Sequence, residues 1–256
     1  MIDPRAVIDP SAELDEGVTI GPFTIIGAKV SIAAGSVIGP HVVINGPTRI
    51  GKENQIYQFA SIGEAPQDMK YAGEPTTLEL GDRNVVREFA TLHRGTVQDQ
   101  GITRIGNDNL LMAYIHIAHD CVLGDHIIMA NAASLGGHVK IDDYAILGGF
   151  SKVHQFCRIG AHSFSGMSSA INMDLPPYVM VAGHPAKPHG INREGLSRRG
   201  FSKDAIQQIK RAYKLIYQSG KRLEEAKKEI NEMLSETPEL KVLADFLSHR
   251  GRGIQR

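Results

Sequence analysis

The sequence contains no tryptophan, only two cysteines and no surplus of either charge, since 28 Lys+Arg balance 28 Asp+Glu among 256 residues. A balanced charge argues against general nucleic-acid binding, which usually leaves a basic surplus. No apolar run approaches the roughly 20 residues that a membrane-spanning helix needs. Met1–Pro4 begin neither a basic leader nor an apolar stretch, so we expect a cytoplasmic protein without a transmembrane segment.

The charge balance is a cancellation between two parts of the chain. Residues 1–190 carry 13 Lys+Arg against 19 Asp+Glu, a net charge of −6, whereas residues 191–256 carry 15 against 9, a net charge of +6. The first part also holds 22 of the 27 glycines and ten of the 11 histidines. We therefore divide the chain into an N-terminal region, 1–190, and a C-terminal region, 191–256.

Aliphatic residues recur every six positions in the N-terminal region. One series runs unbroken from Ile8 to Ile62 and resumes at Leu80, and a second register runs from Ile105 to Ile159. A period of six fits neither an α-helix nor an amphipathic strand. It is the repeat of a parallel β-helix, in which three short strands form each coil. Such a narrow stacked interior has no room for tryptophan.

The two cysteines are predicted to be unpaired. Cys121 and Cys157 both follow an aliphatic anchor by four positions and are 36 residues, or two coils, apart. At the strand spacing this separation is roughly 10 Å, whereas a disulfide needs Cα atoms within about 7 Å. We expect reduced, buried thiols, as is usual in the cytoplasm.

Two stretches interrupt the register, at about 63–79 and 93–104. Insertions into a solenoid project as loops and often carry function. The first contains Asp68 and Lys70 between two prolines, which makes it the better candidate for an arm that contacts a ligand. The sequence assigns no role to the second.

Three histidines are predicted to share one face of the prism. Counted in coils of 18 residues, His119, His138 and His154 occupy nearly the same position on consecutive coils. Stacked imidazoles fit acid–base chemistry or a metal site such as zinc. Asp120 favours the general base, because a carboxylate beside His119 would fix its tautomer and support the imidazolium. A zinc hydratase of the γ-carbonic-anhydrase kind and a non-catalytic scaffold remain alternatives.

The C-terminal region has the periodicity of helices. Ser202 suits an N-cap, apolar residues follow at helical spacing, Gly220 suits a helix end, and Pro238 opens a third segment. The pattern predicts three amphipathic helices packed against the end of the prism. Their basic face is either a solvated surface or a site for an acidic partner.

Five segments closely resemble one known family, the acyl-carrier-protein:UDP-N-acetylglucosamine O-acyltransferases that begin lipid A synthesis in Gram-negative bacteria. They are YQFASIGEAPQDMKYAGEPT (57–76), HIAHDC (116–121), GGHV (136–139), HQFCRIGAH (154–162) and INREGLSRRGFS (191–202). The resemblance implies a left-handed parallel β-helix of hexapeptide repeats with a C-terminal α-helical domain. It also implies a homotrimer with active sites between subunits, and no metal or cofactor. Other hexapeptide acyltransferases, the remaining alternative, share the repeats; the sister N-acyltransferase lacks this combination of first insertion and tail.

The resemblance further implies a role for each candidate residue. His119 would remove the proton from the glucosamine 3-hydroxyl, Asp120 would support it, and the Gly137 N–H would stabilise the oxyanion. The donor would be an (R)-3-hydroxyacyl chain on acyl carrier protein. Substrate contacts would come from Asp68, Lys70, His116, His138, His154 and Gln155, and those to the uridine diphosphate from Asn192, Glu194, Arg198 and Arg199.

Position 167 corresponds to the residue that measures the acyl chain in this family. Glycine there admits the 3-hydroxymyristoyl group, whereas this sequence has Met167. The larger side chain predicts a shorter donor, 3-hydroxydecanoyl first and 3-hydroxydodecanoyl second. The alternative is that Met167 fills a gap in the core.

Overall fold

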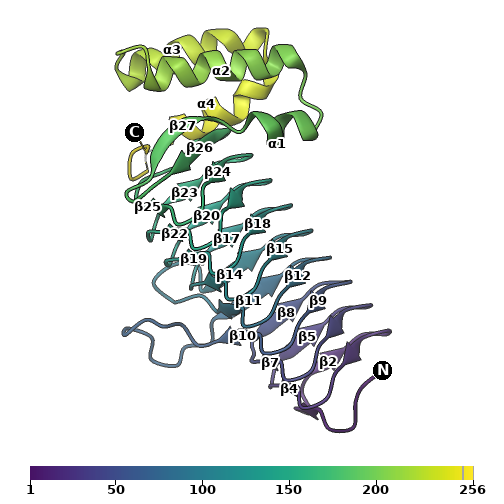
Figure 1. Ribbon diagram of the computed structural model, residues 1–256. Helices are drawn as coiled ribbons and strands as arrows, with labels where there is room; N and C mark the ends of the chain where they lie inside the picture. The colour runs from purple at the N-terminus through teal and green to yellow at the C-terminus, as the bar shows by residue number, and fades with distance from the viewer. Residues whose placement is uncertain (250, 256) are drawn as a thin grey trace.

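A computed structural model describes residues 1–249 and 251–255 of the chain. Three sheets of short strands form the sides of a long prism, and helices cover one end (Figure 1). Strands one coil apart pair in parallel, so that Val7 lies beside Ile25 and Ile25 beside Val43. The fold is the predicted left-handed parallel β-helix with a C-terminal helical region.

Each coil contributes one strand to each of three sheets, which we name A, B and C. Sheet A contains β3 (Thr19–Ile20), β6 (Val37–Ile38), β9 (Gln55–Ile56), β12 (Val85–Val86), β15 (Leu110–Leu111), β18 (Ile128–Met129), β21 (Ile146–Leu147), β24 (Phe164–Ser165), β26 (Val179–Ala182) and β27 (Lys187–Ile191). Sheet B contains β1 (Val7–Ile8), β4 (Ile25–Ile26), β7 (Val43–Ile44), β10 (Ser61–Glu64), β13 (Thr91–His93), β16 (His116–Ile117), β19 (Ser134–Leu135), β22 (Lys152–Val153) and β25 (Ala170–Ile171). Sheet C contains β2 (Glu13–Leu14), β5 (Val30–Ile32), β8 (Thr48–Ile50), β11 (Thr77–Leu80), β14 (Ile102–Ile105), β17 (Val122–Leu123), β20 (Lys140–Ile141) and β23 (Arg158–Ile159).

The six-residue anchors fill the interior of the prism, as predicted. From Ile20 onward both series are buried, because each anchor is covered by the anchors of the coils on either side. The earlier anchors, Ile8 and Leu14, are only half-buried, since they lie in the first coil. Cys121 and Cys157 are both buried and free, which confirms the prediction of unpaired thiols.

Both interruptions of the register leave the prism at one edge, where sheet B passes into sheet C. Strand β10 continues to Glu64 and β11 starts at Thr77, so the first insertion comprises 65–76. Strand β13 ends at His93 and β14 starts at Ile102, so the second insertion comprises 94–101. The irregular parts are therefore shorter than the broken periodicity indicates, because strand pairing continues past the last repeat. Figure 1 shows the loops projecting to the left of the prism.

The chain leaves the prism through a hairpin and then forms helices. Strands β26 and β27 pair antiparallel, a reversal that the six-residue pattern does not predict. The helices are α1 (Arg193–Arg198), α2 (Lys203–Tyr217), α3 (Leu223–Glu232) and α4 (Lys241–Ser248), with 3₁₀ turns at Met233–Ser235 and Pro238–Leu240. Ser202 caps α2 by accepting a hydrogen bond from the Ala205 N–H, as predicted.

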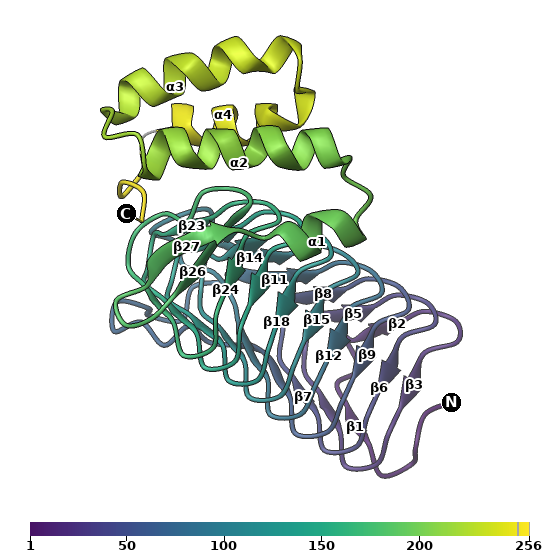
Figure 2. The ribbon, with the colours of Figure 1, turned by 45° about the horizontal axis from the view of Figure 1, so that its top comes forward.

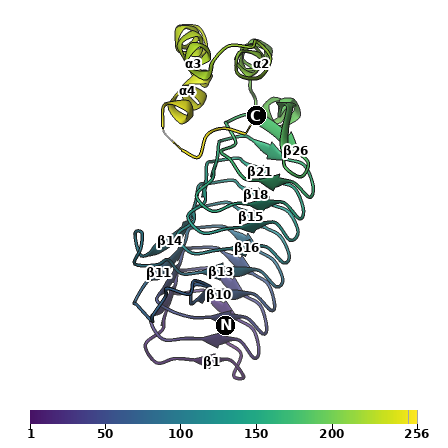
Figure 3. The same ribbon diagram turned by 90° about the vertical axis from the view of Figure 1, so that its left-hand side faces the viewer.

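Figures 2 and 3 show that α2, α3 and α4 lie across one end of the prism. Their apolar faces form a second core, in which Tyr178 from the last coil packs with Leu196 and Ile209. The Tyr178 hydroxyl donates a hydrogen bond of 2.6 Å to the Glu239 carbonyl and so joins the two regions. Among the helices of 1–249 and 251–255, none has the length and apolar character needed to cross a lipid bilayer.

Candidate functional site

The edge between sheets B and C gathers most of the predicted catalytic residues. His119 and Asp120 lie between β16 and β17, Gly137 and His138 between β19 and β20, and Gln155 between β22 and β23. These turns stack because the strands on both sides pair at an offset of 18 residues. The two insertions emerge from the same edge, on the coils before β16. A regular solenoid with two loops at one edge thus builds a recess beside the histidines.

This recess is a cleft of about 620 Å³. It is lined by Gln67, Asp68, Met69, Lys70, Gln98, Asp99, His119, His138, Gln155 and Phe156. The structure therefore brings five predicted site residues together, namely Asp68, Lys70, His119, His138 and Gln155. Of the remaining lining residues, Gln67, Met69 and Phe156 lie within two of the segments that resemble the family, whereas Gln98 and Asp99 lie in the second insertion, outside all five.

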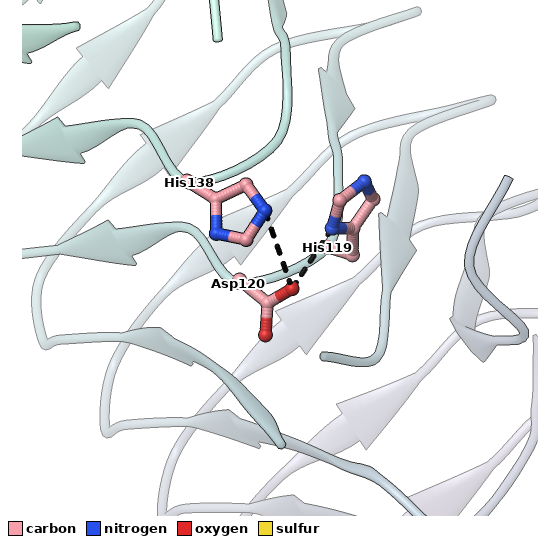
Figure 4. A group of neighbouring side chains, drawn as sticks. All are labelled: His119, Asp120 and His138. Atoms are coloured by element: carbon pink, nitrogen blue, oxygen red, sulfur yellow. Dashed lines mark hydrogen bonds and ion pairs between the residues drawn. The ribbon is translucent and has the colours of Figure 1, made fainter. Parts of the chain in front are cut away.

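His119 and Asp120 form a hydrogen-bonded pair on this cleft. The distance from His119 Nδ1 to Asp120 Oδ2 is 2.9 Å, and the two side chains are 14% and 1% exposed. Burial opposes ionisation of Asp120, but hydrogen bonds from His119 and Thr96 outweigh it and hold the pKa of the carboxyl below its usual range. A carboxylate only accepts hydrogen bonds, so Nδ1 carries the proton. In neutral His119 the free lone pair is then on Nε2, and Figure 4 shows this nitrogen turned away from Asp120.

Gly137 leaves the space in which the His119 ring lies. A Cβ atom at position 137 would lie 2.5 Å from Cε1 and 2.7 Å from Nε2 of His119. Only glycine therefore permits this ring position. Within 1–249 and 251–255, no group accepts a hydrogen bond from the Gly137 N–H, so a donor stands free beside the imidazole.

His138 is held against the same pair. Its ring stacks on Phe156 with centroids 4.4 Å apart and meets the His119 ring edge-on at 5.1 Å. Its Nε2 lies 3.9 Å from Asp120 Oδ2 (Figure 4). Nδ1 lies 2.9 Å from Asp99 Oδ2, on the second insertion.

His119, Asp120 and His138 are also the group that could hold a metal ion, since one ligand atom from each lies within 4.8 Å of the others. Ligand atoms around tetrahedral zinc, at bonds of about 2.0–2.1 Å, are roughly 3.3 Å apart. The 2.9 Å contact between His119 and Asp120 is instead a hydrogen-bond distance. Both Asp120 oxygens also accept hydrogen bonds from Thr96. The geometry fits a base with its supporting carboxylate better than a zinc site.

Three predicted residues do not line this cleft. His116 projects from β16, with Nδ1 2.8 Å from Thr91 Oγ1, and burial and the neighbouring His119 lower its pKa. His154 is exposed and lines a separate groove of about 500 Å³ with Lys152 and His184. Met167 follows β24 at the edge between sheets A and B and is 73% exposed, which excludes the alternative of a gap-filling core residue.

The four residues predicted to contact uridine diphosphate lie on or beside α1. Asn192 is buried and caps this helix, while its amide donates to the His162 carbonyl. Glu194 and Arg198 are exposed. Arg199 lies over the Tyr144 ring at 5.1 Å, and burial lowers its pKa. This position is beside the edge between sheets C and A, away from the histidine cleft of the same chain.

Two residues that contact Asp120 or His138 were not predicted from the sequence. Thr96 donates from its N–H and its hydroxyl to the two Asp120 oxygens, at 2.9 and 2.6 Å. Asp99 contacts His138. Both belong to the second insertion. The only sequence signal for them is that this insertion directly precedes the coil that carries HIAHDC.

A three-sided β-helix of six-residue repeats places the chain in the class of hexapeptide-repeat proteins. The family model for bacterial transferase hexapeptide repeats matches residues 11–46, and that for UDP-N-acetylglucosamine O-acyltransferase, domain 2, matches residues 174–255. The chain belongs to the UDP-N-acetylglucosamine acyltransferase family and is an enzyme.

Solved structures support this membership over the full chain. LpxA from Acinetobacter baumannii is 51% identical, with a TM-score of 0.97, covering 100% of this chain and 99% of that chain. The UDP-N-acetylglucosamine O-acyltransferase (LpxA) from Moraxella catarrhalis is 50% identical, with a TM-score of 0.98 and the same coverage. The Francisella novicida UDP-N-acetylglucosamine acyltransferase is 43% identical, with a TM-score of 0.98, covering 100% and 94%.

Proposed function

We propose that this enzyme transfers an (R)-3-hydroxyacyl group from acyl carrier protein to the 3-hydroxyl of UDP-N-acetylglucosamine, the first step of lipid A biosynthesis. The observation that carries the proposal is the hydrogen-bonded pair of His119 and Asp120 on a cleft beside the free Gly137 N–H. Family membership supplies the substrate class. We place the reaction in the cytoplasm and without a metal or cofactor.

The geometry supports a direct acyl transfer. Nε2 of His119 takes the proton of the sugar 3-hydroxyl while this oxygen attacks the thioester carbonyl carbon. The resulting oxyanion accepts a hydrogen bond from the Gly137 N–H, and a preformed donor of this kind lowers the barrier. As the C–S bond breaks, the carrier thiolate leaves and takes the proton from the imidazolium. Asp120 stabilises the imidazolium between these two steps.

A homotrimer explains why the predicted contacts lie at three different edges. The cleft lies at the edge between sheets B and C. Met167 lies at the edge between sheets A and B, and Arg199 lies beside the edge between sheets C and A. Packing of prisms side by side can place different edges around one site, whereas a single chain cannot. We infer that α1 of a neighbouring subunit supplies the uridine diphosphate contacts, where arginine suits phosphate.

The same arrangement makes Met167 the measure of the acyl chain. Its side chain is exposed in the single chain, so it is available to line a groove between subunits. A methionine at this position shortens the groove relative to a glycine. We therefore propose 3-hydroxydecanoyl as the preferred donor and 3-hydroxydodecanoyl as the next.

The test is acyl transfer to UDP-N-acetylglucosamine from carrier proteins loaded with different chains, with and without a chelator. We expect His119→Ala to assemble normally and to lose at least about 10³-fold in kcat, comparable to removal of other catalytic bases. His41→Ala, an exposed histidine stacked between Phe23 and Phe59 at another edge, is the matched control. Undiminished transfer by His119→Ala would remove the proposed base.

A zinc hydratase is the second candidate, because the ligand atoms of His119, Asp120 and His138 lie close enough to one another to hold an ion. It predicts stoichiometric zinc in the purified protein and an activity that a chelator abolishes. Chelator-resistant acyl transfer would dismiss it.

A further inference from the structure

The second insertion, 94–101, contacts the Asp120 carboxylate of the proposed catalytic pair. Thr96 is 1% exposed, and its N–H and hydroxyl bond to Oδ1 and Oδ2 of Asp120. Thr103, just after the insertion, accepts a hydrogen bond of 2.8 Å from the Asp120 N–H. The Thr96 carbonyl also accepts from Gly101, which closes the insertion into a compact turn. Asp120 is therefore held by both ends of this segment.

Thr96 determines which way the Asp120 carboxylate faces. Oδ2 accepts hydrogen bonds from both the Thr96 hydroxyl and His119 Nδ1, while Oδ1 accepts from the Thr96 N–H. With both oxygens engaged, the carboxylate plane cannot rotate without losing a bond in a buried setting, where an unpaired acceptor is costly. The plane in turn fixes the direction of the His119 ring.

Asp99 makes the corresponding contact to the second histidine. Because its carboxylate can only accept, the proton of His138 must lie on Nδ1. Nε2 of His138 then faces Asp120 Oδ2 at 3.9 Å. The side chains of Asp99 and His138 are 41% and 14% exposed, so the pair lies at the mouth of the cleft. The insertion thus contacts both Asp120, which holds His119, and His138.

The start of the insertion is anchored to its neighbours. The Arg94 guanidinium donates to the carbonyls of Gly46 and Gly63 and to the Tyr71 hydroxyl on the first insertion, at 2.6, 3.0 and 3.0 Å. The segment is consequently a braced turn with fixed ends. Such rigidity is what a positioning element requires, because displacements near 1 Å change rates about 10²-fold.

We propose that the second insertion is a positioning element for both histidines. Thr96 orients the carboxylate that aligns His119, and Asp99 fixes the tautomer and orientation of His138. The proposal rests on the proposed function, in which His119 is the base. Thr96 and Asp99 act through other residues and are positioning residues, not catalytic ones.

Thr96→Val tests the first contact, because it removes the hydroxyl and keeps the side-chain shape and the backbone N–H. We expect kcat to fall about 10- to 100-fold, the loss that corresponds to one hydrogen bond to a charged group, with KM for both substrates unchanged. Thr96→Ser should restore activity. Val97→Ala, at an exposed neighbour in the same turn, should match the wild type.

A double-mutant cycle separates positioning from a general loss of structure. In an Asp120→Ala background, Thr96→Val should cause no further loss of kcat, since its target is gone. Wild-type kcat in Thr96→Val, an equal loss in Val97→Ala, or an undiminished loss in the Asp120→Ala background would each overturn the proposal for Thr96.

Asp99→Ala tests the second contact. The exposure of the pair limits the expected loss to about two- to fivefold in kcat/KM, and Asp99→Asn, which keeps an acceptor, should recover part of it. Nitrogen-15 spectra of histidine-labelled enzyme should show His138 protonated at Nδ1 in the wild type and mixed tautomers in Asp99→Ala. An unchanged His138 spectrum would refute this half of the proposal.

The outcomes remain separable from the proposed function. If His119→Ala keeps full transfer, the base assignment fails and with it the reason for positioning. If His119→Ala is inactive and Thr96→Val is fully active, the base assignment stands and the positioning role fails.

Discussion

Substitution of Gly137 by alanine offers a test of the catalytic geometry that leaves every polar group in place. The new Cβ would lie 2.5 Å from His119 Cε1, whereas ordinary contacts start at 3.4 Å. The ring must therefore move by about 0.9 Å. The backbone conformation is no obstacle, because Gly137 is not among the glycines with positive φ.

A displacement of this size near reacting atoms costs roughly 10²-fold in rate, or about 2.7 kcal/mol of transition-state stabilisation. We expect Gly137→Ala to lower kcat by that factor. Because alanine keeps the backbone N–H, the loss would report the position of His119 rather than the loss of a hydrogen-bond donor.

The assay is steady-state acyl transfer, accompanied by thermal unfolding to confirm the fold. Gly27→Ala is the matched control, because Gly27 also lacks a positive φ and lies between β4 and β5 at the same edge, several coils before the cleft. Its Cβ would come no closer than 3.2 Å to any atom. Wild-type kcat in Gly137→Ala, or an equal loss in Gly27→Ala, would refute the reasoning.

Three further predictions concern the acyl donor, the thiols and pH. Met167→Gly should shift the donor preference toward longer chains in competition assays, and an unchanged preference would contradict the role of Met167. Burial raises the pKa of Cys121 to about 12 and that of Cys157 to about 11, so neither should react with a thiol reagent until the protein unfolds; rapid native labelling followed by mass spectrometry would argue against this. Burial, and then the neighbouring His116, lower the pKa of His93 to about 4. Between pH 6.5 and 4 the unfolded chain therefore binds more protons than the folded chain. The free energy of unfolding should decrease as the pH is lowered through this window, by up to about 3 kcal/mol. Denaturant titrations of His93→Phe should show a shallower fall, and an equal slope would exclude this histidine as a source.

The fold could be predicted because one aliphatic residue recurs at every sixth position. Each of the anchors from Ile20 to Ile62 is an aliphatic side chain at a fixed interval, and a coil that buries one must bury the next. The six-residue period did not predict the hairpin of β26 and β27, because the chain reverses direction there, after the repeat has ended. Helix α1 was also not predicted, since six residues are too few for a periodic signal.

Residue spacing alone predicted the site only where it follows the repeat, whereas Asp68 and Lys70 on the first insertion were predicted from the family resemblance. His119 and His138 meet because their turns stack one coil apart, and counting placed them correctly. Counting also placed His154 nearby, but a side chain two positions before the turn residue Phe156 points to another groove. Thr96 and Asp99 lie in an insertion, whose path depends on hydrogen bonds that no residue spacing encodes.

The single-file stacking of coils also has a mechanical consequence. Within the described residues, strands β1 to β26 pair with one another only across one coil, so a force applied to the chain ends would detach the prism one coil at a time. Each regular coil of 18 residues would release about 60 Å of extended chain. Longer steps would mark the coils from Ser61 to Thr91 and from Thr91 to His116, which carry the insertions. The edge that carries the cleft would thus appear as two irregular intervals in an otherwise even force–extension trace.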